Sequence, residues 1–158
     1  KRGWTGVSAD NTMAIFYGVS TISVIPLSSI SDRLGSRKLI LYPALLLTII
    51  SFSLIPYVDG IVIWILMILA GMFMDGFMSA IITLLLETEE IGQAYSGTAL
   101  GVVFTIAQLG GVISPPLGNS LAGINPGLPF IFWAALSLAA MITLIFIKET
   151  GWRSKKTI

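Results

Sequence analysis

The sequence predicts an all-α membrane protein, a bundle of helices that crosses the bilayer several times. Hydrophobic residues make up 55% of the chain, charged residues only 11%, and the mean hydropathy is +0.92. A soluble domain carries roughly 25% charged residues, which it needs to cover its surface. The apolar residues also fall into runs of about 20, the length of helix that crosses ~30 Å of hydrocarbon.

Five such runs predict five transmembrane helices in a single domain. They cover residues 12–31, 39–57, 61–87, 97–122 and 130–147, and a tail follows at 148–158. Helices are expected because a lone strand in lipid would leave its backbone polar groups without partners. The connections are short, so consecutive helices are expected to be antiparallel neighbours.

The positions of lysine and arginine predict the orientation of this bundle. One side carries Arg33, Arg37, Lys38, Lys148, Arg153, Lys155 and Lys156, whereas the other side carries Lys1 and Arg2. The cytosolic ends of membrane proteins are enriched in lysine and arginine. We therefore expect a multi-pass protein of the plasma membrane, with the basic turn after the first span and the C-terminus in the cytosol.

Polar residues divide the five spans into two groups. The first, third and fourth spans carry polar or small residues three or four positions apart, which places them on one face of a helix. They are Tyr17, Thr21 and Ser28 on the first span, Gly71, Asp75, Ser79 and Thr83 on the third, and Thr98, Gly101, Thr105 and Gln108 on the fourth. The second and fifth spans are almost entirely aliphatic, so we expect them to face lipid and the other three to surround a polar interior. The alternative is that these small and hydroxyl residues only hold helices together.

Asp75, in the middle of the third span, is the strongest candidate for a functional residue. An acid at the centre of a bilayer costs at least ~2.5 kcal/mol on insertion scales and usually marks a substrate or proton pathway. None of the five predicted spans contains a lysine or arginine that could pair with it. We expect Asp75 to take up a proton or bind a cationic group, with Tyr17, Thr21, Thr105 and Gln108 lining the same cavity. The alternative is a protonated Asp75 that hydrogen-bonds between helices.

The fourth span contains residues that favour a kink. Gly110 and Gly111 are followed by Pro115 and Pro116. Proline has no amide donor and its ring clashes with the preceding turn, so this pair is expected to bend the outward half of the helix. A bent helix beside a cavity is suited to movement, although glycine and proline are also frequent in ordinary membrane helices.

The turn between the first two spans resembles a known family motif. Its sequence is Ser28-x-x-x-Asp32-Arg33-Leu34-Gly35-Ser36-Arg37-Lys38. It is similar to the Gly-x-x-x-Asp-Arg-x-Gly-Arg-Arg/Lys loop of the major facilitator superfamily, which joins the second and third helices of each six-helix half on the cytosolic side. Asp32, Arg33, Gly35 and Arg37 match, whereas Ser28 replaces a glycine and Ser36 replaces a basic residue. The resemblance implies that this loop braces a cytosolic gate through charge contacts.

The resemblance also implies which part of such a protein this chain is. The five spans correspond to helices two to six of a half, in which the third and sixth helices are peripheral, in agreement with the two aliphatic spans. The third span lacks the arginine that is usual in the N-terminal half, so we expect helices eight to twelve of the C-terminal half. Because the chain starts at Lys1 and not at Met, we expect a piece of a longer protein. Its partners would be the bilayer, a small-molecule substrate and the missing other half.

The function implied is secondary transport of a small solute by alternating access, with coupling to protons through Asp75. A non-transporting membrane subunit or sensor on the same fold is the alternative. An intramembrane enzyme is disfavoured because the chain has no histidine and no cysteine, and its mid-membrane acid stands alone. We expect no metal, no cofactor and no nucleic-acid partner.

Overall fold

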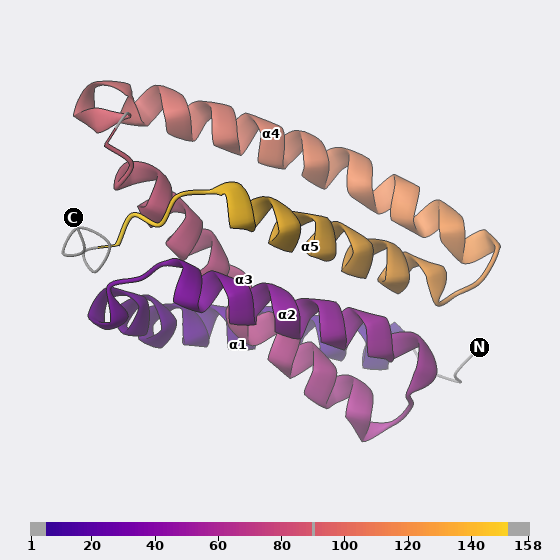
Figure 1. Cartoon of the computed structure of the whole chain (residues 1–158). Coiled ribbons are helices and arrows are strands. Elements are labelled where there is room, and N and C mark those ends of the chain that lie inside the picture. Colours follow the sequence, from indigo (N-terminus) through magenta and orange to yellow (C-terminus); the bar gives the residue numbers. More distant parts are fainter. Residues whose placement is uncertain (1–5, 90, 152–158) are drawn as a thin grey trace.

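The computed structural model describes residues 6–89 and 91–151 and consists of five long helices (Figure 1). They are α1 (Gly6–Leu34), α2 (Lys38–Leu54), α3 (Ile61–Leu86), α4 (Gly92–Ser120) and α5 (Leu128–Phe146). Short 3₁₀ turns at Ile55–Tyr57 and Leu121–Gly123 follow α2 and α4. All five helices are long and apolar enough to cross a membrane. The predicted all-α bundle of five spans is therefore confirmed.

Two of the helices extend beyond the apolar runs that predict them. Helix α1 begins at Gly6 and α4 at Gly92, several residues before the predicted spans at 12 and 97. Polar residues such as Asp10 and Tyr95 occupy these extra turns, because the backbone hydrogen-bond ladder continues where hydropathy has already fallen. Glycines with positive φ stand next to two helix ends. Gly35 after α1 and Gly60 before α3 have φ values of 63° and 62°, a conformation that glycine adopts without strain.

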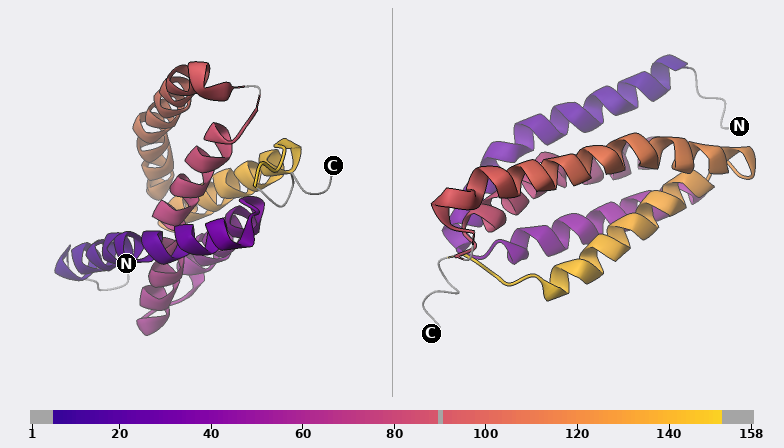
Figure 2. Two further views of the ribbon diagram at one scale, coloured as in Figure 1. Left: turned by 90° about the vertical axis from the view of Figure 1, so that its left-hand side faces the viewer. Right: turned by 90° about the horizontal axis from the view of Figure 1, so that it is seen from above.

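Helix α3 lies at the centre of the arrangement. Helix α1 packs chiefly on α3, and α2 packs on both α3 and α5. Helix α4 contacts α3 and α5 less extensively, and its apolar stretch is exposed almost throughout. The two views in Figure 2 show α1 and α4 diverging on either side of α3, on the side of the molecule opposite α5.

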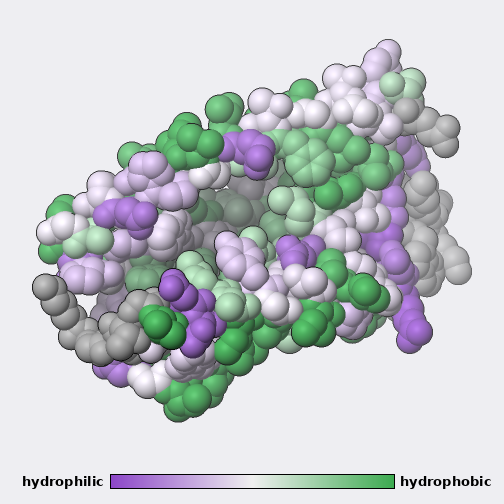
Figure 3. Space-filling view, turned by 180° about the vertical axis from the view of Figure 1, so that it is seen from behind, coloured by the Kyte–Doolittle hydropathy of each residue, from purple (hydrophilic) through white to green (hydrophobic). Residues whose placement is uncertain are grey.

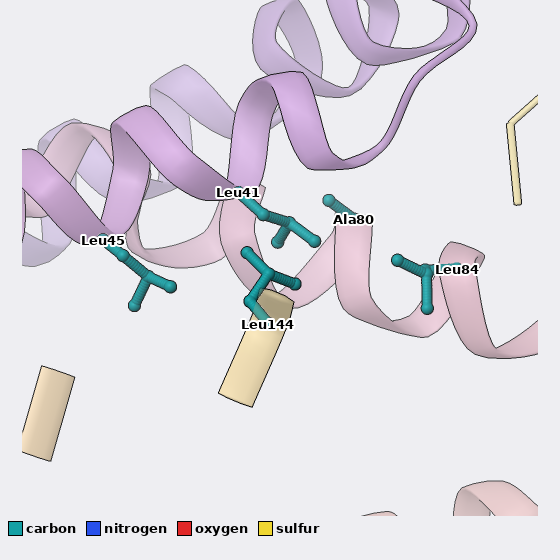
Figure 4. Close-up of a cluster of buried hydrophobic side chains, with 5 residues drawn as sticks. All are labelled: Leu41, Leu45, Ala80, Leu84 and Leu144. Atoms are coloured by element: carbon teal, nitrogen blue, oxygen red, sulfur yellow. The ribbon is translucent and has the colours of Figure 1, made fainter. Parts of the chain in front are cut away.

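An apolar core joins α2, α3 and α5. One cluster consists of Leu41, Leu45, Ala80, Leu84 and Leu144 (Figure 4). A second cluster, towards the other end of the bundle, consists of Ile55, Ile63, Leu66 and Met67. Lipid tails are as apolar as leucine, so the fit between side chains holds such clusters together in a bilayer more than the hydrophobic effect does.

Helices α1 and α3 approach closely through small residues. A Cβ atom on Gly71 would lie 2.5 Å from the carbonyl oxygen of Phe16, so the two backbones are in contact there. Further along, the hydroxyl oxygens of Ser28 and Ser79 are 3.0 Å apart and share a hydrogen bond. For Gly71 and Ser79, the structure thus supports the alternative interpretation, in which small and hydroxyl residues hold membrane helices together.

Candidate functional site

A cluster of charged and polar side chains from several helices lies at one end of the bundle, which we call the charged end. The α1–α2 turn, the C-terminal end of α3 and the end of α5 all lie there, at the left of Figure 1. From behind, hydrophilic residues line that end of the molecule, whereas much of the remaining surface is apolar (Figure 3). The basic residues of the tail at 153, 155 and 156, and Lys1 and Arg2, lie outside the described residues.

Arg37 forms the centre of an ion-pair cluster at the charged end. Its guanidinium donates two hydrogen bonds to Glu87, from Nε to Oε2 at 3.0 Å and from Nη2 to Oε1 at 2.5 Å. Its Nη1 donates to Asp32 Oδ1 at 2.6 Å and to Ser31 Oγ at 3.1 Å. The hydrogen bonds to Glu87 and Asp32 outweigh the effect of burial and raise the pKa of Arg37 above its ordinary value. A permanent cation therefore joins α1 to the end of α3.

Glu149, just after α5, completes the cluster. Its carboxylate accepts hydrogen bonds from the Ser36 hydroxyl at 2.6 Å and from the backbone N–H groups of Arg37 at 2.9 Å and Lys38 at 3.0 Å. It also accepts from the N–H groups of Thr150 and Gly151, at 3.1 and 3.2 Å. Burial alone would raise the pKa of Glu149, but the hydrogen bonds from Ser36 and the backbone outweigh it and hold this pKa below its ordinary value of 4.5.

The residues around Glu149 also contact neighbouring helices. The Thr150 hydroxyl lies 3.3 Å from both the Leu84 carbonyl and Glu87 Oε2. Lys38 Nζ donates to the Ile145 carbonyl at 3.5 Å, near the end of α5. Gly151 packs so tightly on the carbonyl of Gly35 that no side chain would fit there. The segment Glu149–Gly151 is therefore seated on the α1–α2 turn.

The structure brings together three of the four predicted loop residues. Asp32 and Arg37 form the ion pair, and Gly35 makes the turn and lies under Gly151. Arg33 is exposed and takes no part in the contacts of this cluster. Sequence reasoning missed Glu87 and Glu149. The signal was present, because alternate helices must end on the same side, so acids at the ends of the third and fifth spans lie near the basic turn.

A groove runs along the face of the molecule that Figure 3 shows, between α1 and α4 with α3 at its base. Helix α4 also carries an open hollow of about 380 Å³, lined by Phe104, Thr105, Gln108, Leu109 and Val112. The side chains of Tyr17 and Thr21 on α1 are exposed as well. The hydroxyls of Thr21 and Thr105 donate to carbonyls one turn earlier in their own helices.

The backbone N–H of Asp75 is hydrogen-bonded to a neighbouring helix, whereas its carboxylate has no partner in the described part of the chain. Its N–H donates to the hydroxyl oxygen of Ser20 at 3.0 Å, and Ser20 is fully buried between α1 and α3. The Asp75 side chain is half-buried, and no described residue hydrogen-bonds to its carboxylate or pairs with it. Within residues 6–89 and 91–151, no group of acidic side chains has a metal-binding arrangement.

Helix α4 runs without a break through Gly110, Gly111, Pro115 and Pro116, and the kink there stays a prediction. Cβ atoms on Gly110 and Gly111 would have no neighbour within 4 Å. Close packing occurs further on, where Gly118 lies against the Trp133 ring and Trp133 Nε1 donates to Ser114 Oγ at 3.2 Å. The C-terminal end of α4 is thus anchored to α5.

Comparison with known proteins gives relatives that match most of this chain. An uncharacterized protein of Archaeoglobus fulgidus is 28% identical over 152 residues, which cover 94% of this chain and 67% of the relative. The multidrug resistance protein MdtG of Proteus mirabilis is 32% identical over 151 residues, or 92% of this chain and 35% of the relative. Multidrug resistance protein 2 of Bacillus subtilis is 27% identical over 121 residues, or 73% of this chain and 28% of the relative. No solved structure matches.

The chain spans only about a third of the length of the two multidrug resistance proteins. The sequence profile of the Major Facilitator Superfamily matches residues 1–157. Together with five helices that can span a membrane, this match identifies an integral, multi-pass membrane protein. The chain belongs to the Major Facilitator Superfamily.

Proposed function

We propose that the protein is a secondary transporter, not an enzyme, and that it moves a small solute by alternating access. The observation that carries this proposal is the family match over residues 1–157. Two relatives are named as multidrug resistance proteins, so drug-like organic compounds are the first substrates to try. In such transporters the two halves rock about a site near the middle of the membrane, and this chain would supply helices eight to twelve.

The groove between α1 and α4 is the proposed share of this chain in the solute pathway. Tyr17, Thr21, Thr105 and Gln108 are exposed and are proposed to line it, and Asp75 on α3 has no partner among the described residues. A carboxylate at this depth needs a proton or a cation to offset its desolvation. Asp75 is therefore the proposed site of proton coupling or of contact with a cationic group of the solute.

The charged end is the proposed cytosolic gate of the transporter. The membrane in which it is proposed to work is the plasma membrane. Its cluster ties the ends of α1, α3 and α5 together through Arg37, Glu87 and Glu149. Positive charge at this end favours the cytosolic side. While the cluster is intact, the cytosolic ends of these helices cannot separate, so opening on that side requires these bonds to break.

The test compares Asp75→Asn with wild type in the full-length protein, reconstituted in liposomes with an imposed pH gradient and a panel of organic solutes. The variant is expected to insert normally and to lose proton-driven uptake, because an amide cannot exchange a proton. Asp10→Asn, which removes an exposed acid on α1, serves as the control and should keep full uptake. Uptake by Asp75→Asn equal to wild type would refute the role of Asp75. Absence of flux by the wild type, for every solute, would favour the subunit or sensor.

A further inference from the structure

We propose that Ser20 is a positioning residue for Asp75. Its buried hydroxyl donates a hydrogen bond to the Asp75 carboxylate when this group is ionised, and the bond opens when the carboxylate takes up a proton. The pairing of the two side chains is a structural claim about the contact between α1 and α3. Only its part in transport rests on the proposed function.

The first argument is that two groups with complementary needs lie next to each other without partners. Ser20 is fully buried, and its oxygen accepts the Asp75 N–H at 3.0 Å. Thr12 and Thr21 on α1 donate to carbonyls one turn earlier, whereas the Ser20 hydroxyl donates to no described residue. The Asp75 carboxylate accepts from none either. A buried donor without an acceptor and a carboxylate without a donor are both unfavourable, and one hydrogen bond between them satisfies both.

The second argument is that the carboxylate can reach the hydroxyl. In a helix the N–H groups point towards the N-terminus, and the side chains lean in the same direction. Because the Asp75 N–H points at the oxygen of Ser20, the Asp75 side chain leans towards the same atom. Rotation about its Cα–Cβ bond, between staggered positions, moves the carboxylate between the Ser20 hydroxyl and the proposed solute pathway.

The third argument is that the contact between the two helices fixes the position of Ser20. A Cβ atom on Gly71 would lie 2.5 Å from the carbonyl oxygen of Phe16, and one on Gly76 would lie 2.9 Å from the side chain of Leu27. Phe16 and Leu27 stand before and after Ser20 on α1, and the two glycines stand before and after the acid on α3. Such close approach through small residues holds membrane helices together. The acid, and not the serine, therefore moves when the proton is exchanged.

Charged groups of the other helices do not take the place of Ser20 as a partner. In the described α1, α2, α4 and α5, the charged residues lie at or near helix ends and are Asp10, Asp32, Arg33 and Lys38. The titratable side chain nearest to Ser20 along α1 is Tyr17, which is exposed. A neutral hydroxyl is thus the donor that offsets the desolvation of an ionised Asp75. The protonated acid carries no charge to stabilise, so it leaves the hydroxyl for the pathway.

The experiment is infrared spectroscopy of the full-length protein, because the frequency of a carboxyl band reports the hydrogen bonds of that group. The difference between wild type and Asp75→Asn isolates the bands of Asp75, and a pH titration records both its ionised and its protonated form. The same difference is then measured in Ser20→Ala and in Ser28→Ala. Ser28→Ala is the matched control, since it removes a hydroxyl from the same helix contact, but one that is bonded to Ser79.

Ser20→Ala should shift the band of the ionised Asp75 carboxylate to the frequency of a group with fewer hydrogen bonds, and Ser28→Ala should leave this band unchanged. An unchanged band in Ser20→Ala would overturn the pairing. An equal shift in both variants would overturn it as well, because it would report a general loosening of the two helices. These results do not depend on whether the protein transports.

Uptake into liposomes provides the second measurement. Ser20→Ala should lower kcat of proton-driven uptake about tenfold or more, because the loss of a hydrogen bond to a charged group has an effect of this order. The KM for the solute should stay unchanged, since the buried Ser20 does not face the pathway, and Ser28→Ala should keep both constants. A shifted band with unaltered uptake would overturn the part of Ser20 in transport. A wild type that moves no solute would refute the proposed function alone, and the infrared bands would still decide the pairing.

Discussion

Arg37 shows why the charged end needs an arginine at this position. It is only 6% exposed, and its planar guanidinium gives two donors to Glu87 and a third to Asp32, a fork that lysine cannot reproduce. The family motif contains Arg37 and its partner Asp32, but not the two glutamates that also bind Arg37. Glu87 and Glu149 lie 50 and 112 residues away along the chain, and neither belongs to the motif. A single sequence indicates the end at which such acids gather, but not which pairs form.

Glu149 should make the stability of the charged end depend on pH. Its pKa in the folded protein lies below the ordinary value of 4.5, so the stabilisation that it provides is complete above that value. It is lost as the pH falls through the folded pKa. Thermal unfolding measured from pH 7 to pH 3 should therefore show a steeper loss of stability in wild type than in Glu149→Gln, only below about pH 4.5. The difference is limited to about 1.4 kcal/mol per pH unit for a single proton.

Wild type and Glu149→Gln both retain Asp32 and Glu87, so the difference between the two stability curves reports on Glu149. A constant gap between the curves from pH 7 to pH 3 would contradict the assigned role, because it would mean that the ionisation of Glu149 does not matter.

At the scale of elements, the sequence predicted the helices, but it did not predict which helix faces pack against each other. Apolar length determines a membrane helix, because every backbone group must be bonded within it. The same lengths do not say which faces meet. The stripe of Gly71, Asp75 and Ser79 was predicted to face a polar interior, yet Gly71 and Ser79 pack on α1 and only the Asp75 carboxylate lacks a partner among described residues. The structure thus supports the helix-packing interpretation for Gly71 and Ser79, whereas the polar-interior interpretation stays a prediction for Asp75.

The α1–α3 contact gives a prediction about glycine. In Gly71→Ala the new Cβ would meet the Phe16 carbonyl oxygen at 2.5 Å, and because backbone cannot move aside as a side chain does, the two helices must separate. We expect a loss of about 1–3 kcal/mol, the usual effect of overpacking, measured by unfolding in detergent. Gly18→Ala on α1 is the matched control, since its Cβ would have no neighbour within 4 Å. Equal stability of the two variants would show that the helices do not approach at Gly71.

At the scale of the molecule, the chain exposes two kinds of apolar surface that look alike by composition. Helix α5 exposes Leu138, Ile142 and Ile145, and α4 exposes Phe104, Leu109 and Val112. The surface of α4 includes the hollow that Thr105 and Gln108 line and is the proposed border of the groove, whereas α5 lies away from the groove, on the other side of the molecule (Figure 2). The family and the division of polar residues predict water in the groove and lipid around α5.

Single cysteines distinguish these two environments, because thiol reagents react with ionised thiols in water and not with thiols in lipid. In the full-length protein, Thr21→Cys and Gln108→Cys should react with a membrane-impermeant maleimide, and a transported solute should slow that reaction. Ile142→Cys should stay unlabelled, although Ile142 is 50% exposed in the structure and, like Thr21 and Gln108, belongs to the exposed residues. If Gln108→Cys is as inert as Ile142→Cys, the groove faces lipid, and the solute pathway must lie elsewhere. If both react, α5 faces water, and the predicted lipid-facing surface is wrong.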